Sequence, residues 1–262
     1  MAFSPAQFNA VKTKVDKGID DLEAQLAALR TAIRLQPQVA MMPEFLRDAI
    51  EWCAEQIYRT GHHICVTVKD IAVGIAAPLY FFAYSLEWLD VRGQATNVVG
   101  QLKPEAMPAV NSWAGSAAVS YKSHIKPQGD AANKIATIAE KTSAALAISA
   151  AAGLAFYAAI ALLLAKVIAA VTTAVVLLGS AVLSLAGLVV FVGELGLTTG
   201  MISGLVTALV AFLGSQAQNL VSLKGEAIDN SFFPGGRWPD PFTGSYHDGS
   251  VSDGDADWSL NR

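Results

Sequence analysis

The sequence predicts an all-α protein: an elongated helical bundle, followed by apolar helices of the membrane type and a disordered tail. Two observations support this prediction. Apolar residues recur at helical spacing near the N-terminus, and the 82 residues from Thr142 to Leu223 carry only two charged side chains, Lys166 and Glu194. A transmembrane helix needs roughly 20 mostly apolar residues, so this stretch has room for two or three such helices. We expect a bilayer or a protein partner to cover it.

The composition narrows the classes of function. The chain is 53% hydrophobic and 15% charged, with a mean hydropathy of +0.42, whereas a soluble domain is typically about 25% charged. Residues 1–141 carry 14 basic and 14 acidic side chains, and residues 225–262 carry two basic and seven acidic ones. Because no block of Lys or Arg accompanies stacked aromatic residues, we do not expect nucleic-acid binding.

The first 35 residues predict an amphipathic helix. Ser4 can cap this helix, Pro5 suits its first position, and Gln7 can complete a capping box. A stripe of apolar residues follows at spacings of three and four, and it comprises Phe8, Val11, Val15, Ile19, Leu22, Leu26, Leu29 and Ile33. The stripe predicts either a core-facing helix of a bundle or a seam with another protein.

A second helix is expected to begin at Pro43 and to present an apolar face up to Gly61. Residues Ile64–Val68 have strand composition, but we assign them to a helix because a lone strand would lack a partner. Residues Ile71–Leu86 are uncharged and too short to span a membrane alone. They predict a buried helix that kinks at Pro78, with membrane contact as the alternative.

The segment from Asn111 to Tyr121 predicts a helix-turn-helix hairpin. Gly115 lets the chain turn tightly, and Trp113 can plug the end of the resulting helix pair. Ala117, Ala118 and Tyr121 would begin the returning helix.

At these residues the chain resembles the W-x-G family of small helical-hairpin proteins exported by type VII, or ESX, secretion systems. The resemblance covers roughly residues 86–145 and rests on Trp113, Gly115 and Tyr121 between two helices. The C-terminal segment also resembles the acidic tails of ESX-associated proteins, with Asp255 and Asp257 before a docking aromatic, Trp258. The resemblance implies export without a cleaved leader and a helical partner, type VII components or a chaperone.

The chain departs from the family in two respects. Family members are short and soluble, whereas this chain adds N-terminal helices and a long apolar region. The family export signal, a Tyr followed four residues later by an acidic residue, is not met, because Ile125 follows Tyr121 and Ser250 follows Tyr246 at that distance. Either a partner supplies the signal or the chain is not exported, and a chance W-A-G turn is the remaining alternative.

Lys166 is predicted to mark the boundary of a membrane-type hairpin, because a lysine at bilayer depth is costly. Val167–Val192 and Leu197–Leu220 would form two spanning helices joined by Gly193–Gly196, which places Glu194 at the hairpin tip.

A glycine ladder with a spacing of four adds a packing prediction for the second of these helices. It comprises Gly196, Gly200 and Gly204, which would let another helix approach closely. That helix belongs either to this chain or to another copy in a homo-oligomer.

No motif for catalysis, a cofactor or a metal is evident. His62 and His63 do not have the spacing of a zinc site with Cys53 and Cys65. The two cysteines either form a disulfide or remain as buried free thiols.

These patterns divide the chain into four segments: N-terminal helices at 1–85, the W-x-G hairpin region at 86–141, apolar helices at 142–223 and an acidic tail at 224–262. We expect a non-enzymatic ESX-associated protein that assembles through helix packing and associates with a membrane. It would reside in the cell envelope or be secreted without a cleaved signal peptide. The alternatives are a resident membrane protein with a cytoplasmic partner-binding domain, and a soluble α-helical pore-forming toxin.

Overall fold

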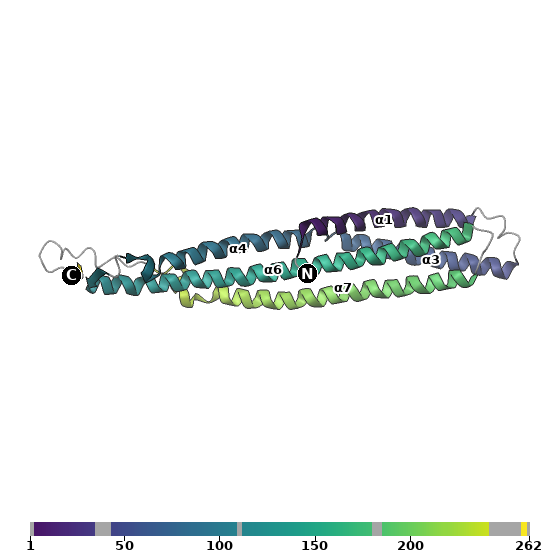
Figure 1. The fold of residues 1–262 in the computed structure, drawn as a ribbon. Helices are drawn as coiled ribbons and strands as arrows, with labels where there is room; N and C mark the ends of the chain where they lie inside the picture. The colour runs from purple at the N-terminus through teal and green to yellow at the C-terminus, as the bar shows by residue number, and fades with distance from the viewer. Residues whose placement is uncertain (1–2, 35–42, 109–111, 180–184, 241–257, 261–262) are drawn as a thin grey trace. The chain divides into compact units, whose positions relative to one another are not determined.

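The computed structural model describes residues 3–34, 43–108, 112–179, 185–240 and 258–260, and it confirms the all-α class (Figure 1). The chain forms two compact units, each assembled from distant parts of the sequence. Unit 1 comprises residues 1–82 and 148–214, and unit 2 comprises residues 83–147 and 215–262.

The first helix, α1 (Pro5–Arg34), begins where the capping residues predict. The hydroxyl oxygen of Ser4 accepts a hydrogen bond from the backbone N–H of Gln7 at 3.5 Å. The predicted stripe faces the core of unit 1, which favours the bundle over the seam with another protein. Its fully buried members are Phe8, Val15, Ile19, Leu22, Leu26 and Leu29.

The next two helices are α3 (Glu44–Ala72) and α4 (Ala77–Gln101). The helical assignment of residues 64–68 is confirmed. Gly61 does not end α3 but allows close contact with α1, since a Cβ at this position would lie 2.8 Å from the Leu26 Cδ2. Pro78 does not kink a helix; it is the second residue of α4, where proline is well tolerated.

Two long helices follow, α6 (Ser116–Gly179) and α7 (Leu185–Ile228). The predicted connection at Gly193–Gly196 is wrong, because these residues lie inside α7, and Glu194 is therefore not at a hairpin tip. Each glycine costs a helix only about 1 kcal/mol, and Leu195, which is 1% exposed, anchors this part of α7 in the core.

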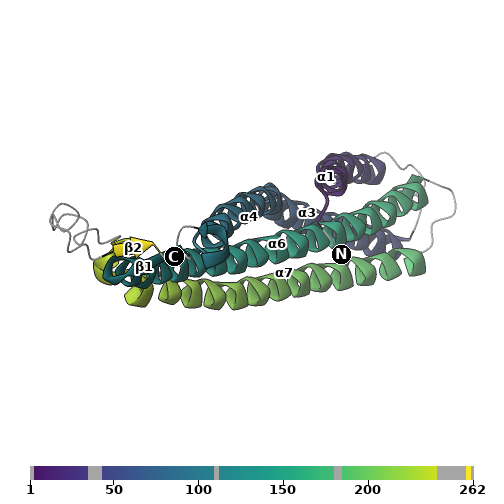
Figure 2. The same cartoon turned by 60° about the vertical axis from the view of Figure 1, so that its left-hand side comes forward.

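Unit 1 is a bundle of α1, α3, the second half of α6 and α7 up to Gly214, which lie side by side in Figures 1 and 2. In both views α6 lies between α1 and α7. The core contains large apolar side chains from all four helices, among them Leu22, Ile57, Ile64, Ile160, Leu164, Leu178 and Leu195.

Unit 2 contains α4 from residue 83, the first half of α6 and the end of α7. A buried hydrogen bond of 2.7 Å from the Ser143 hydroxyl to the Ser85 carbonyl joins α6 to α4. Short elements complete the unit: η1 (Pro104–Ala106), β1 (Trp113–Gly115), η2 (Asn230–Phe232), η3 (Pro234–Gly236) and β2 (Trp258–Leu260).

The W-x-G segment differs from the helical turn that the sequence predicts. It forms the strand β1, which pairs antiparallel with β2, so that Gly115 lies opposite Trp258 and Trp113 lies opposite Leu260. Gly115 has a φ of 101°, a value that few residues other than glycine adopt, as expected for a tight turn. The prediction of a disordered tail at 224–262 is thus wrong for residues 224–236, which lie in α7, η2 and η3, and for residues 258–260, while Asp255 and Asp257 lie outside the described residues.

Candidate membrane-binding surface

The first half of α7 presents an apolar face to solvent. Only one side of this half of the helix reaches the core of unit 1, through Leu195, Thr198 and Ile202. The opposite side exposes large apolar side chains, with exposed fractions of 52% to 68%: Val189, Val190, Leu197 and Met201. Such contiguous apolar surface marks an interaction site in most soluble proteins.

Helix α6 extends this face. Leu162 and Val176 are 69% and 61% exposed, and an open groove of about 830 Å³ runs between α6 and α7. Its lining is almost entirely apolar: Ala159, Leu162, Leu163, Ala165, Lys166, Ala169, Met201, Gly204 and Leu205. We call the apolar face this groove together with the exposed side chains of Leu162 and Val176 on α6 and of Val189, Val190, Leu197 and Met201 on α7.

Two charged residues interrupt the apolar face. Lys166 lines the groove, and Glu194 lies exposed on α7 between Val190 and Leu197. Within the described part of the chain, neither side chain has an ion-pair partner within 4.0 Å. Both side chains are exposed to solvent.

The opposite side of unit 1 is charged and covers α6. Helix α1 comes so close that a Cβ at Gly18 would lie 2.5 Å from the Leu164 Cδ2. Lys14, Lys17 and Asp21 of α1 line a cavity of about 510 Å³ together with residues of α6 that include Leu162 and Ile168, so Leu162 lies between this cavity and the groove beside α7. Unit 1 thus carries an ionic surface on α1 and an apolar surface on α7.

The glycine ladder belongs to the exposed side of α7. A Cβ at Gly196, Gly200 or Gly204 would meet no described atom within 4 Å. The ladder therefore does not mediate close packing within the described part of this chain.

The second unit gathers charged residues where α7 ends against α6. The Lys141 ammonium donates a short hydrogen bond to Glu226. Lys134, whose side chain is only 16% exposed, lies 3.8 Å from Glu226 and 3.6 Å from Asp229. The Lys141 hydrogen bond lowers the pKa of Glu226 below its ordinary value, and the Ser231 backbone N–H lowers that of Asp229.

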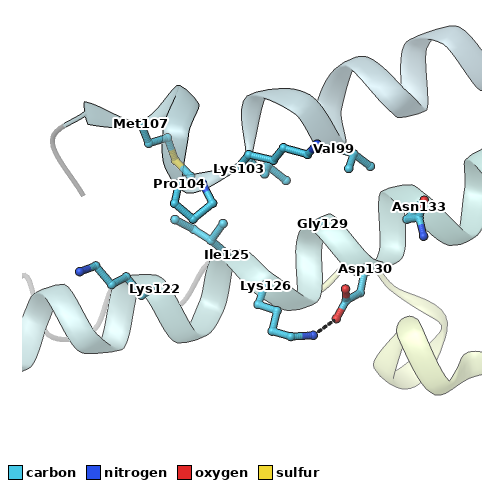
Figure 3. A pocket seen from close by; sticks show the side chains of 11 residues that line it. Val99, Lys103, Pro104, Met107, Lys122, Ile125, Lys126, Gly129, Asp130 and Asn133 are labelled. Carbon is cyan, nitrogen blue, oxygen red and sulfur yellow. Dashed lines mark hydrogen bonds and ion pairs between the residues drawn. The ribbon is translucent and has the colours of Figure 1, made fainter. Parts of the chain in front are cut away.

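A cavity of about 490 Å³ lies between the end of α4, η1 and α6 in unit 2 (Figure 3). Pro104, Met107 and Ile125 form its apolar floor. The lysines at its rim do not converge: Lys122 extends away from the floor, and Lys126 pairs with Asp130 at 2.6 Å. This arrangement does not form a preorganised anion site.

The structure assigns no functional site to Tyr121 or to the two cysteines. The hydroxyl oxygen of Tyr121 lies 3.9 Å from the sulfur of Met107. Cys53 and Cys65 are free, buried thiols on α3; twelve residues of helix separate them by about 18 Å, which excludes a disulfide. Among the described residues, no three His, Cys, Asp or Glu side chains are placed to hold a metal ion.

Sequence reasoning missed two features of these sites. The periodicity of residues 142–179 did not reveal that one side of α6 is covered by α1 and α3, because both sides of the helix are apolar. The pairing of β1 with β2 joins residues more than 140 positions apart, and no local signal predicts it.

Three stretches of the chain are long and apolar enough to cross a membrane: Glu44–Gln101, Ala118–Leu178 and Val189–Phe232. The apolar window of the third is the least buried, at 17%, against 39% for the second. Helix α7 therefore has the most surface that lipid could cover. Comparison with family models, curated proteins and solved structures finds no match to this chain.

Proposed function

We propose that this chain is a non-enzymatic membrane-binding protein whose contact with lipid is the apolar face of α6 and α7. The observation that supports this proposal is the asymmetry of unit 1: α7 exposes Val190, Leu197 and Met201, whereas the charged helix α1 lies on the other side of α6. In a protein surrounded only by water, an exposed apolar surface on one side would not contribute to stability.

The energetics favour contact with lipid. Full burial of a large apolar side chain is worth about 1.5–3 kcal/mol, and these side chains are half exposed, so each would contribute about 1 kcal/mol. The six exposed side chains of the apolar face would together supply on the order of 6 kcal/mol. This exceeds the cost of holding Lys166 and Glu194 at the interface, where charged heads can remain hydrated.

The position of α1 argues against a resident transmembrane protein. It favours instead a water-soluble bundle that opens when it meets a membrane. Lys14, Lys17 and Asp21 lie beside α6 in the bundle. If α6 spanned a bilayer in this arrangement, these charges would lie at bilayer depth, each at a cost of about 2.5–3.5 kcal/mol. Deep insertion of α6 and α7 therefore requires α1 to separate from them, as in the pore-forming alternative.

We further propose that the protein reaches the envelope or the medium through a type VII system. The W-x-G resemblance at Trp113 and Gly115 supports this route, together with the helices α4 and α6 on either side of them. Cell fractionation tests it: the untagged protein should leave the cytosol when the system is intact and remain there when the system's ATPase is inactivated.

Vesicle flotation tests the membrane function. Purified protein should float with phosphatidylcholine–phosphatidylglycerol vesicles, and the double substitution Leu197→Glu/Met201→Glu should reduce floating by at least about tenfold, since it places two charges in the apolar face. Val73→Glu is the matched control, because Val73 is 87% exposed but lies in the turn after α3. Equal flotation of all three proteins would contradict the proposal.

A further inference from the structure

The cavity between α1 and α6 combines basic side chains with an apolar lining. Lys14 and Lys17 border it three residues apart on α1, a spacing that makes two side chains neighbours on one helix surface. We call this space of about 510 Å³ the lysine cavity. Apart from its charged residues it is lined only by apolar side chains and one glycine: Val11, Gly18, Ala158, Ala161, Leu162, Ala165 and Ile168.

The two lysines of this cavity are unpaired. Lys12, on the same helix, forms an ion pair of 2.7 Å with Asp16. In contrast, no carboxylate of the described residues lies within 4.0 Å of the Lys14 or Lys17 ammonium. Asp21 lines the same cavity but does not pair with either of them. Two ammonium groups and one carboxylate thus give the lysine cavity a net positive charge beside its apolar lining.

The dimensions of the lysine cavity fit one acyl chain. Its lining on α6 extends from Ala158 to Ile168, about 15 Å at 1.5 Å per residue. The hydrocarbon core of a bilayer is about 30 Å thick, so the acyl chains of one leaflet also extend over about 15 Å. Sites for small ligands typically have volumes of about 300–1,000 Å³ and a mostly apolar lining with a few polar groups, and the lysine cavity has both properties.

The lysine cavity adjoins the apolar face. Leu162 and Ala165 line both this cavity and the groove beside α7. An acyl chain can therefore pass from one to the other without leaving apolar surface. A membrane in contact with the apolar face would thus supply the cavity with lipid.

We propose that the lysine cavity binds an acidic phospholipid, with one acyl chain against the alanines of α6 and the phosphate between Lys14 and Lys17. This inference rests on the proposed membrane function and names the class of lipid. An acidic head is favoured over a zwitterionic one, because the lysines repel the positive group of the latter. Asp21 lies about 6 Å further along α1 than Lys17, so its carboxylate keeps the phosphate at the lysines.

Binding of a single-chain lipid tests the cavity without a bilayer. The full chain is titrated with palmitoyl lysophosphatidylglycerol below its micelle concentration, and native mass spectrometry measures the lipid bound. We expect one molecule per chain, and about tenfold weaker binding of palmitoyl lysophosphatidylcholine. Lys14→Gln/Lys17→Gln should weaken binding of the acidic lipid by about tenfold or more. The matched control, Lys12→Gln/Arg59→Gln, removes the same charge from two exposed ion pairs and should bind as the wild type does.

A cavity-filling substitution tests the place of the acyl chain. Ala161→Leu adds a large side chain to the lysine cavity and should abolish binding of lysophosphatidylglycerol without a change of charge. Ala159→Leu, which lines the groove beside α7 instead, is the control and should retain binding. Urea unfolding shows whether each variant is folded, and if Ala161→Leu is not, the lysine variant decides. Binding that is absent in the wild type, or equal in the wild type and Lys14→Gln/Lys17→Gln, would overturn the inference.

Flotation of the wild-type chain separates failure of this inference from failure of the membrane function. If the proposed membrane function is wrong, the protein does not float with phosphatidylcholine vesicles or with phosphatidylcholine–phosphatidylglycerol vesicles. If only the lysine cavity is wrong, the protein still floats, but it binds lysophosphatidylglycerol no better than lysophosphatidylcholine.

Discussion

Units 1 and 2 are held together by different interactions. Unit 1 buries large apolar side chains such as Leu22, Ile57 and Leu164. Unit 2 buries mainly small ones, namely Ala95, Ala118, Ala131, Ala132, Ala136, Ala139, Ser85 and Ser143, and adds the ionic cluster around Glu226 and an ion pair of 3.5 Å between Arg92 and Glu140. We infer that the stability of unit 1 depends on packing and that of unit 2 depends more on pH and salt, because ionic contacts are screened and titrate.

The largest effect is expected in the core of unit 1. Leu164→Ala should lower the free energy of unfolding by about 2–5 kcal/mol, because it leaves a cavity against Gly18 and its neighbours. Leu162→Ala, two residues away and 69% exposed, should change it by less than about 0.5 kcal/mol. Urea unfolding followed by circular dichroism measures both, and equal effects would mean that α1 does not cover α6 in solution.

A smaller effect is expected at the W-x-G strand. Gly115→Ala places a Cβ on a residue with a φ of 101° and should cost about 1–3 kcal/mol through backbone strain. Gly100→Ala, near the end of α4 where a Cβ meets nothing within 4 Å, should be neutral or stabilising. If hydrogen exchange of unit 2 is the same in both variants, the strand does not persist in solution.

The smallest effect is expected from the ionic cluster, and it depends on pH. Glu226 and Asp229 have pKa values below their ordinary values of 4.5 and 3.8 in the folded chain. A carboxyl group whose pKa is lower in the folded chain stabilises the fold when the pH is above the ordinary pKa of that group. This contribution disappears as the pH falls through the pKa that the group has in the folded chain. Hydrogen exchange near the end of α7 should therefore accelerate below about pH 4.5, while the amides around Leu164 remain protected.

Substitution of Glu226 sharpens this prediction. Glu226→Gln should accelerate exchange near the end of α7 at neutral pH and weaken its dependence on acid. Glu87→Gln, at an exposed position of α4 without an ion pair among the described residues, is the control. If exchange near the end of α7 accelerates at low pH as strongly in Glu226→Gln as in the wild type, other carboxylates cause the acceleration.

The sequence predicts the packing of α1 better than the arrangement of α6 and α7, for a physical reason. In α1 the buried side is lined by apolar residues and most of the other positions are polar or charged, so periodicity alone identifies the buried side. In α7 both sides are apolar, and the turn-like sequence Gly193–Gly196 misled the assignment. Burial of Leu195, a tertiary interaction, keeps that segment helical.

The same reasoning explains the mixed outcome for the candidate sites. The apolar region could be recognised as a surface needing cover because its lack of charge is a local property of the sequence. The sequence predicts Glu194 at the hairpin tip, but it lies nine residues after the first residue of α7. The position of the connection depends on how α6 and α7 pack, which is not a local property of the sequence. The pairing of Trp258 with Gly115 depends on chain reversal over the whole of α6 and α7, which no local pattern encodes.

The two buried thiols of α3 have a practical consequence. Cys53 and Cys65 are each 2% exposed and lie on the side of α3 that faces the bundle. A thiol reagent in water can reach them only after α3 loses its neighbours, so their rate of modification reports the fraction of time that the bundle is open. The rate at which a thiol reagent modifies the wild-type chain on vesicles therefore measures the opening step, and no added label is needed.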